Sequence, residues 1–443
     1  MLKTFKIGGI HPKEMKISAG SEIQTIAVPD QVIIPLSQHI GAPCQPIVKK
    51  GDVVKVGTQI GKSVGFVSAN IHSSVSGTVV KIEKTLDASG YKRDAVVIKC
   101  EGDEWEDNID RSNNLIKDIN LSTKEILDKI AESGIVGMGG ATFPTHIKLT
   151  PPPGTKPEVL IVNGVECEPF LTADHALMLE KSDEIIVGTR IVMKALNIDK
   201  AVIAIENNKK DAIKKLTEKT KEYPNISVQP LVVKYPQGGE KQLIDAVISR
   251  QVPSGALPIS VGAVVQNVGT IFAIYEAVQK NKPLVERIVT VTGEHVNKPS
   301  NILARIGIPA SNLIEFAGGM PDSTGKVISG GPMMGKAVSD TSIPVTKGTS
   351  GILIMPSEKS KRTKMRDCIR CTDCISVCPM GLNPTQLMTF TEFEMWDNAE
   401  KNKITDCIEC GSCSFTCPAH RPLLDYIRLG KGRVNTIIRA RKN

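Results

Sequence analysis

Cys368-Ile-Arg-Cys371-Thr-Asp-Cys374-Ile-Ser-Val-Cys378-Pro379 is the most informative stretch of this 443-residue chain. The same form returns as Cys407-Ile-Glu-Cys410-Gly-Ser-Cys413-Ser-Phe-Thr-Cys417-Pro418. Each run is C-x2-C-x2-C-x3-C-P, a spacing that holds a pair of [4Fe–4S] clusters, with the fourth cysteine of each run bound to the other cluster. The sequence therefore predicts one cluster on Cys368, Cys371, Cys374 and Cys417, and a second on Cys378, Cys407, Cys410 and Cys413.

Zinc and disulfides explain these cysteines less well. A structural zinc site takes four ligands, often as two separated C-x2-C pairs, whereas each run here already carries four cysteines. The N-terminal residues 1–9 contain no apolar segment for export, so we expect a reducing compartment, in which disulfides are rare. Cys44, Cys100 and Cys167 stand alone and are expected to be small buried hydrophobes.

Length and composition indicate a globular protein of several domains. At 443 residues the chain is expected to form about two to four of them. No run of about 18 apolar residues occurs, so we expect no membrane-spanning helix. The net charge of +8 is modest and aromatic residues make up only 4%, so we expect no nucleic-acid partner.

Short strands between glycine turns dominate residues 29–105, as in 48–61 and 71–83. This pattern predicts an all-β domain, and it resembles the barrel-sandwich fold of biotinyl and lipoyl domains. Those domains carry a modified lysine on an exposed hairpin. No lysine lies in 64–69, where that hairpin is expected, and Lys62 lacks the flanking motif. We therefore expect a scaffold and not a swinging arm.

Strands alternate with helices over residues 106–285, which predicts a Rossmann-like α/β layered domain. The expected elements are a helix over 123–133 capped by Ser122, a strand over 159–163, a helical stretch over 173–196, a strand over 200–206, a helix over 208–223 and a strand over 226–234.

The remaining segments complete the predicted organisation. Residues 286–355 show a strand at 287–292, a short helix near 301–306 and glycine pairs at 318–319 and 330–331, which resembles the β-grasp module called the SLBB domain. The expected domains are a lead-in (1–28), a barrel-sandwich scaffold (29–105), the α/β domain (106–285), the β-grasp domain (286–355) and an α-helical, ferredoxin-like two-cluster domain (356–443). This last domain opens with a basic linker, carries a helical insert near 385–396 and ends in a basic tail.

Gly134-Ile-Val-Gly137-Met-Gly139-Gly140-Ala-Thr-Phe143-Pro144-Thr145-His146-Ile-Lys148 is the second informative stretch. It begins like a dinucleotide fingerprint, but Thr142 occupies the third glycine position and a helix precedes the loop. Clustered glycines let backbone N–H groups approach an anion, and Lys148 adds a positive charge. A flavin phosphate would suit this loop, and an ordinary glycine-rich turn is the alternative.

Three later segments leave strands at their carboxyl ends, where α/β sheets bind ligands. They are Asn163-Gly-Val-Glu166-Cys167-Glu168-Pro169, Tyr235-Pro-Gln-Gly238-Gly239-Glu240-Lys241 and Asn267-Val-Gly269-Thr270. With the glycine loop they resemble, in order, the FMN-binding segments of the NADH-oxidising flavoprotein subunit of respiratory complex I. The chain departs from that family at Met138, where arginine is usual, and at Gly164-Val165, Cys167 and Gly269.

The resemblance implies a noncovalent FMN and a site for NAD(H) as substrate. FMN would be held by Gly137, Gly139, Gly140, Lys148, Asn163, Glu166, Gly238, Gly239, Glu240, Asn267 and Thr270. Phe143 and Glu168 would shape the NAD(H) site. Cys167 takes the place of a serine beside the flavin, and both a flavin contact and simple packing stay open for it. No catalytic acid or base is expected, since a hydride donor needs no titrating side chain.

The opening Phe5-Lys-Ile-Gly8-Gly9-Ile10-His11-Pro12 resembles the G-G-I-H-P start of the RnfC family of Rnf electron transport complexes, and the order of domains matches over essentially the whole chain. This resemblance implies an NADH-linked flavin iron–sulfur oxidoreductase subunit, peripheral to the cell membrane on its cytoplasmic side. It would exchange hydride with NAD(H) at FMN and relay single electrons through two clusters to membrane subunits of an ion-translocating complex that also uses ferredoxin. The direction of electron flow and the coupling ion are left open.

Two other functions remain. A soluble NADH-dependent cobalamin reductase would share the FMN and cluster portions. A ferredoxin-like electron carrier would use the front half only for docking. The basic stretch after Tyr426 contains six cations and no acid, so it is expected either to dock on acidic partners or anionic headgroups, or to be a solvated end.

Overall fold

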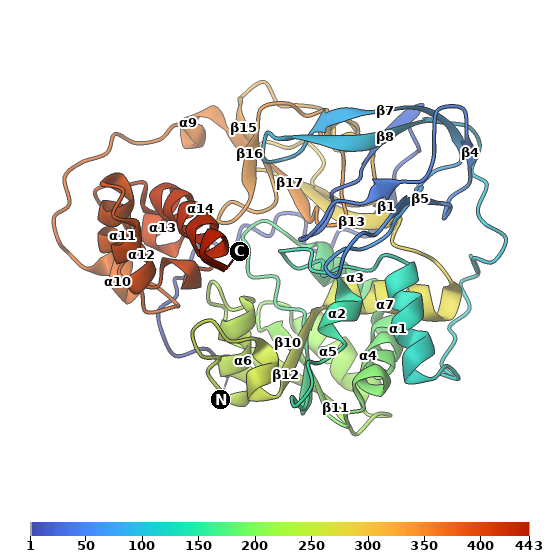
Figure 1. Ribbon diagram of the computed structural model, residues 1–443, viewed down its shortest axis with the longest axis horizontal. Coiled ribbons are helices and arrows are strands. Elements are labelled where there is room, and N and C mark those ends of the chain that lie inside the picture. The colour runs from blue at the N-terminus through green and yellow to red at the C-terminus, as the bar shows by residue number, and fades with distance from the viewer. Residues whose placement is uncertain (1, 443) are drawn as a thin grey trace.

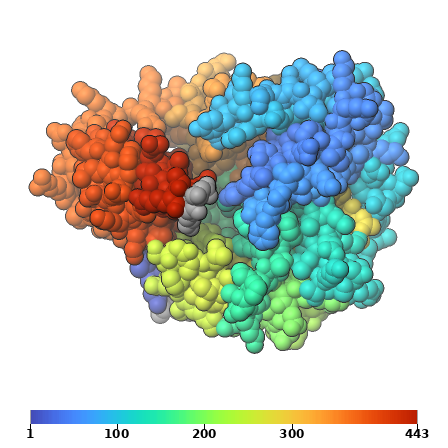
Figure 2. Space-filling model, in the orientation of Figure 1, coloured from blue at the N-terminus to red at the C-terminus, as the bar shows by residue number. Residues whose placement is uncertain are grey.

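The computed structural model describes residues 2–442, which form four sheets and a separate group of helices. The helical group carries the cysteine runs and stands at one end of the molecule (Figures 1 and 2, orange to red). The helix-covered parallel sheet and the β-rich regions occupy the rest of the molecule (Figure 1). The expected mixture of barrel-sandwich, α/β, β-grasp and helical cluster regions is confirmed.

The first β region contains two sheets. One has the order β2-β8-β7-β4 and the other β3-β5-β6. The strands are β2 (Gln31–Pro35), β3 (Gln45–Pro46), β4 (Val53–Val54), β5 (Gln59–Lys62), β6 (Ile71–His72), β7 (Gly77–Leu86) and β8 (Lys92–Cys100). Val32 and Ile98 of the first sheet and Ile60 and Ile71 of the second are fully buried in one hydrophobic cluster, so the two sheets share the core expected of a barrel sandwich.

A parallel four-stranded sheet of order β11-β10-β9-β12 forms the centre of the α/β region. Its strands are β9 (Val159–Asn163), β10 (Ala201–Glu206), β11 (Ile226–Leu231) and β12 (Ala263–Asn267). Alternate residues of β9 face opposite sides, because Leu160 and Val162 join one hydrophobic cluster while Val159 and Ile161 join another. Because all neighbouring strands are parallel, their carboxyl ends lie at the same edge of the sheet.

Helices cover both faces of this sheet. Helices α4 (Ser182–Leu196), α5 (Lys210–Thr220) and α7 (Val268–Lys280) contribute to one core, and α6 (Glu240–Ile248) to the other. The remaining helices are α1 (Thr123–Glu132), α2 (Thr145–Lys148) and α3 (Ala173–Glu180), with a 3-10 turn over Pro258–Val261. Ser122 caps α1 through a capping box with Glu125, as expected.

Two local expectations differ from the structure. The stretch 173–196 is two helices, because the chain turns at Lys181 between α3 and α4. The helix expected near 301–306 is wrong, since these residues belong to strand β14 (Ser300–Arg305). β14 lies between β1 (Ile23–Thr25) and β13 (Glu286–Thr292) and hydrogen-bonds to both, so its position inside a sheet overrides its local sequence.

The β-grasp region is a six-stranded sheet of order β1-β14-β13-β17-β15-β16. Its other elements are α8 (Ala310–Phe316), β15 (Thr324–Ser329), β16 (Lys336–Val338) and β17 (Gly351–Pro356). β1 comes from the lead-in segment, so residues near the N-terminus complete a sheet whose other strands lie after residue 285.

The cysteine runs lie in a helical domain. It contains α10 (Asp373–Ser376), α11 (Pro384–Glu392), α12 (Trp396–Lys401), a 3-10 turn (Ile404–Asp406), α13 (Ser412–Thr416) and α14 (Leu423–Lys442). The short helix α9 (Ser357–Ser360) precedes this domain and packs on β15 and β17 of the β-grasp sheet. The basic stretch after Tyr426 belongs to α14, which packs on α11 and buries Val434. Among residues 2–442, no helix is both long and apolar enough to cross a membrane.

Candidate functional site

The flavin segments predicted from the sequence meet at the carboxyl edge of the parallel sheet. Asn163 ends β9 and Asn267 ends β12, and these two residues are paired in register. The Asn163 Nδ2 donates to the Gly238 carbonyl at 2.9 Å. Counting the glycine loop as the first flavin segment, this contact joins the second segment, which begins at Asn163, to the third, which begins at Tyr235. Parallel strands place their carboxyl ends together, and this edge is where α/β sheets bind ligands.

The glycine loop is attached to the start of α7. The Met138 backbone N–H donates to Thr270 Oγ1 at 2.9 Å, and Thr270 is fully buried. Gly139 lies so close to Asn267 that an added Cβ would be 3.0 Å from the asparagine Cβ. Gly140 has a φ of +155° and faces open space, since an added Cβ would meet no atom within 4 Å. The loop is therefore packed on one side and open on the other.

A charged pair crosses this edge. Lys148 Nζ lies 2.5 Å from Glu240 Oε1, with both side chains partly exposed. Glu240 is the first residue of α6, which follows Gly238 and Gly239 and has no side-chain cap. An uncapped helix N-terminus presents backbone N–H groups that suit an anion. Phe143 is half-buried in the glycine loop, and its carbonyl accepts the Gly137 N–H at 2.9 Å.

Glu166 lies at the same sheet edge, and its carboxylate is hydrogen-bonded to backbone N–H groups. Its two carboxylate oxygens accept the N–H groups of Asp174 and His175 at 2.8 and 3.2 Å, at the start of α3. Asp174 in turn accepts the Asn267 Nδ2 at 2.7 Å. Burial, with Glu166 nearby, raises the pKa of Asp174 to about 6. Glu166 therefore orders the segment that positions Asn267.

Glu168 points to the β-grasp region. Its carboxylate accepts the backbone N–H groups of Met333 and Met334 at 3.1 and 2.8 Å. Burial raises the pKa of Glu168 to about 7, although these two hydrogen bonds oppose the shift. Of the residues expected at the nicotinamide site, Glu168 therefore contacts a neighbouring loop, whereas Phe143 stays with the glycine loop.

Sequence reasoning missed several residues that shape this edge. The Lys16 ammonium, from the lead-in, donates to the carbonyls of Glu166, Glu168 and Leu171 at 2.7 to 2.9 Å. Arg287 of β13 is buried and donates to Met138 Sδ at 2.8 Å, so a cation reaches the glycine loop at the position where the related family carries arginine. Both residues are distant in sequence from the motifs, and no local pattern marks them.

Cys167 lies beside the third segment. Its Sγ accepts the Gly238 backbone N–H at 3.4 Å, and the side chain is partly buried. Burial raises the pKa of Cys167 above its usual range.

The cysteine runs divide into the two sets expected from their spacing. Cys368, Cys371, Cys374 and Cys417 line a cavity of about 360 Å³, which we call the outer set. Cys378, Cys407, Cys410 and Cys413 line a second, more enclosed cavity, which we call the inner set. Within residues 2–442, no three His, Cys, Asp or Glu side chains converge closely enough to hold a single metal ion. Each set supplies four thiols, the number of ligands that a cubane cluster takes.

The two sets differ in their surroundings. Cys368 and Cys371 of the outer set are exposed. The inner set is flanked by Leu387, Leu424 and Ile427, and burial raises the pKa of Cys407 to about 11 and that of Cys413 to about 12.

The inner set is also the one that meets the flavin edge. The Tyr235 hydroxyl donates to the Cys410 carbonyl at 2.8 Å, and Tyr235 is only 1% exposed. On the neighbouring cysteine run, Gln242 Nε2 donates to the Pro379 carbonyl at 3.1 Å. Tyr235 begins the third flavin segment and Gln242 lies in α6.

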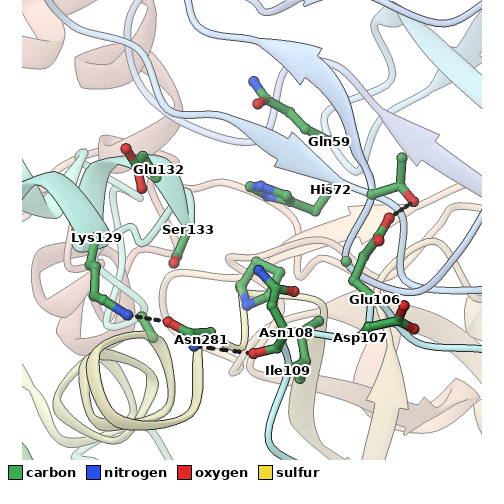
Figure 3. Close-up of a pocket in the computed structure, with 14 residues that line it drawn as sticks. Gln59, His72, Glu106, Asp107, Asn108, Ile109, Lys129, Glu132, Ser133 and Asn281 are labelled. Atoms are coloured by element: carbon green, nitrogen blue, oxygen red, sulfur yellow. Dashed lines mark hydrogen bonds between the residues drawn. The ribbon is translucent and has the colours of Figure 1, made fainter.

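A further cavity lies away from the flavin edge and the cysteine sets. It measures about 510 Å³ and is lined by residues of the barrel-sandwich region, the linker after it and the ends of α1 and α7. Figure 3 shows the His72 imidazole in this space, with Glu106 to one side and Ser133 to the other. None of the expected flavin or cluster residues lines it.

Family models match the chain in four places. The RnfC barrel sandwich hybrid domain matches residues 3–103 and the Nuo51 FMN-binding domain matches residues 130–276. The SLBB domain matches residues 288–337 and a 4Fe-4S dicluster domain matches residues 360–421. FMN and [4Fe–4S] clusters are thus the cofactors of this protein.

Curated relatives extend over nearly the whole chain. The C subunit of the proton-translocating ferredoxin:NAD(+) oxidoreductase complex of Clostridium ljungdahlii is 49% identical over 90% of this chain and 87% of its own length. The equivalent subunit of the Na(+)-translocating complex of Acetobacterium woodii is 46% identical over 97% of this chain and 96% of its own. That of the ion-translocating oxidoreductase complex of Rhodobacter capsulatus is 39% identical over 98% of this chain and 84% of its own.

A solved structure shares the fold at low identity. A crystal structure of NAD+-reducing [NiFe]-hydrogenase in the air-oxidized state aligns with a TM-score of 0.52 and 18% identity, over 71% of this chain and 66% of that one.

The four domain matches occur in the order read from the sequence, and the relatives are similar along nearly the full length. The chain therefore belongs to the RnfC family, the C subunits of ion-translocating ferredoxin:NAD oxidoreductase complexes.

Proposed function

We propose that this chain is the peripheral electron-transfer subunit of an Rnf-type ferredoxin:NAD oxidoreductase. It exchanges hydride with NAD(H) at FMN and relays single electrons through two [4Fe–4S] clusters to membrane subunits. One observation carries this proposal: the segments expected to hold FMN lie at one sheet edge, and that edge is hydrogen-bonded to the inner cysteine set through Tyr235.

FMN, when bound, accepts a hydride from a nicotinamide and gives up the electrons one at a time. The chain supplies binding and orientation. Gly140 leaves open space beside the loop, and the uncapped start of α6 at Glu240 offers N–H groups to a phosphate. Lys148 adds a cation, which Glu240 holds in place. The packed side of the loop, against Asn267 and Thr270, keeps these donors fixed.

Two residues are assigned to the NAD(H) site on the family resemblance. Phe143 lies in the glycine loop itself. Glu168 holds the backbone of Met333 and Met334, so it acts by placing the β-grasp loop over 331–335 beside the flavin edge. The five domain ranges predicted from the sequence are retained as part of the proposal.

The order of the clusters follows from their positions. The inner set lies against the flavin edge, so it exchanges electrons with the flavin. The outer set, with Cys368 and Cys371 exposed, exchanges electrons with the next carrier. This relay serves either direction of electron flow. The relatives in Clostridium ljungdahlii and Acetobacterium woodii are named for different coupling ions, so family membership leaves the ion open.

The partners are the other subunits of the complex. The relatives are each one subunit of an oxidoreductase complex, which supports an assembly with further subunits here. We propose contact with membrane subunits on the cytoplasmic side, with ferredoxin acting elsewhere in the complex. Cobalamin reduction and simple electron carriage remain the competing activities, but the relatives named above are oxidoreductase complex subunits.

The test uses the full-length protein, purified anaerobically and supplied with FMN. NADH should bleach one flavin per chain and then reduce both clusters, followed by absorbance and by electron paramagnetic resonance. An electron carrier without NADH activity would show clusters that dithionite reduces and NADH does not. A cobalamin reductase would turn over cob(III)alamin with NADH at a rate comparable with that of artificial one-electron acceptors.

A further inference from the structure

Tyr235 occupies an unusual place between two cofactor regions. It is the largest fully buried side chain of the described residues, and its hydroxyl ends on the loop that carries Cys410. Its backbone is also fixed, because Tyr235 and Ile10 exchange N–H to carbonyl hydrogen bonds at 2.8 Å in each direction. Both ends of this side chain are therefore held.

The hydroxyl has one proton, and the geometry gives it to the Cys410 carbonyl. A phenol keeps its proton near neutral pH, so the hydroxyl is a donor. A buried donor that lost its acceptor would be costly, which makes this hydrogen bond a firm attachment.

Further contacts secure the same surface. The Gly9 N–H donates to the Val377 carbonyl at 2.9 Å, next to Cys378. Gly411, next to Cys410, lies so close to the β-grasp loop that an added Cβ would be 3.0 Å from the Met333 carbonyl oxygen. The lead-in, the α/β domain and the β-grasp loop thus all meet the loops of the inner set. The Tyr235 contact differs from the other two because it joins a side chain of a flavin segment to the backbone of an inner-set cysteine.

We infer that Tyr235 is a positioning residue that fixes the inner cluster against the flavin edge and sets its reduction potential. The inference rests on the proposed function and adds to it one residue that determines how electrons pass between the cofactors. Hydrogen bonds around the cysteine ligands and exclusion of solvent are the protein's main means of tuning cluster potentials. A donor dipole near the cluster favours the reduced, more negative state, so its loss should make that state harder to reach.

The experiment is Tyr235→Phe in the full-length protein with FMN and both clusters. The variant keeps the ring and loses only the hydroxyl. Tyr275→Phe is the matched control, since Tyr275 of α7 is 2% exposed within the α/β core and its hydroxyl accepts the Ile116 N–H at 3.1 Å. Redox titrations followed by electron paramagnetic resonance would give the potential of each cluster, and rapid mixing with NADH would give the rates.

In Tyr235→Phe, we expect the equilibrium constant for electron transfer from the flavin to the inner cluster to fall about tenfold. This corresponds to a reduction potential of the inner cluster that is lower by about 59 mV for one electron. NADH bleaching of the flavin should keep its wild-type rate, and the outer cluster should keep its potential. Tyr275→Phe should change neither cluster. Unchanged inner-cluster potential and unchanged flavin-to-cluster rate in Tyr235→Phe would overturn the inference, as would equal shifts of both clusters.

A second variant guards against loss of folding. Gln242→Met removes the donor to the Pro379 carbonyl from the same interface while keeping the tyrosine. It should shift the inner cluster in the same direction by less, and a shift confined to the outer cluster would contradict the inference. Failure of the proposed function would look different, because wild-type protein would then lack flavin bleaching by NADH or lack cluster iron.

Discussion

The inner and outer cysteine sets share one motif and have opposite surroundings. The outer set lines a cavity of about 360 Å³ and exposes Cys368 and Cys371, whereas the inner set is enclosed by apolar side chains and hydrogen-bonded to other regions of the chain. Solvent exposure and hydrogen bonding are what separate the potentials of clusters with the same ligands. The motif thus specifies the cofactor, while tertiary contacts specify its place in the relay.

Removing one ligand from each set tests this difference most strongly. Cys410→Ala should lose the inner cluster, lower iron to about four per chain, and leave the outer cluster reducible by dithionite but not by NADH. Cys371→Ala should lose the outer cluster and leave the inner one reducible by NADH. The measurement is iron content with electron paramagnetic resonance after each reductant. If NADH still reduced the outer cluster in Cys410→Ala, the proposed order of the clusters would be wrong.

Blocking the flavin edge should affect both sets together. In Gly139→Trp the new side chain would collide with Asn267, so we expect flavin content and NADH-dependent cluster reduction to fall at least about tenfold, a loss of roughly 1.4 kcal/mol or more in binding. Dithionite should reduce both clusters normally.

Gly432→Trp is the control for this variant, because an added Cβ at Gly432 in α14 meets no atom within 4 Å. The control should keep its flavin, measured after heat release. Full flavin content and normal bleaching in Gly139→Trp would show that the glycine loop is not the site.

The contact between Glu168 and the β-grasp loop predicts a dependence on pH. The pKa of Glu168 is raised to about 7, so between about pH 4.5 and 7 the native protein keeps a proton that the unfolded chain has released. Stability therefore falls as pH rises through this window and levels off above it. One such group contributes at most about 3 kcal/mol over the window.

Glu168→Gln should remove that part of the slope. The unfolding temperature of the variant, relative to wild type, should rise from pH 5 to pH 7 and then stay constant. Asp174 and Glu206, whose pKa values are raised to about 6 and about 7 by burial, give both proteins the same background slope, so the difference isolates Glu168. A difference that does not change with pH would mean that Glu168 is ionised throughout in the native state.

Local patterns predicted the elements whose signals lie within a few residues. The strand over 159–163 and the capped helix α1 are present where they were predicted. The cysteines line two cavities in the crossed arrangement, and their ligation of two clusters stays a prediction. The misses depend on distant partners. Residues 301–306 read as a helix but lie between β1 and β13 in a sheet, and Tyr235 gains its role only because the Cys410 loop packs on it. The contact of Tyr235 with Cys410 joins segments 175 residues apart, and no window of sequence shows it.

The structure changes the interpretation of the C-terminal basic stretch. It is part of α14, and several of its cations pair within the domain: Arg428 and Lys431 contact Glu409, and Arg441 contacts Asp397 and Glu400. Truncating this stretch would also remove the buried Val434, so a deletion could not separate docking from folding. Exposed arginines that take part in none of these four ion pairs are better probes of docking.

Reversing the charge of Arg433 and Arg439, both exposed on α14, should give the smallest effect. Each basic residue near an anionic surface contributes about 1 kcal/mol, so the double Glu variant should weaken recovery with membranes at low salt by at most a few kcal/mol and leave NADH oxidation with artificial acceptors unchanged. Lys210→Glu with Lys214→Glu on α5 makes the same charge change on an exposed helix of the α/β domain, away from the cluster domain, and is the control. If the two double variants behave alike, α14 does not face the membrane complex. Attachment would then depend on another surface, and the face around the exposed Cys368 and Cys371 is the next one to test.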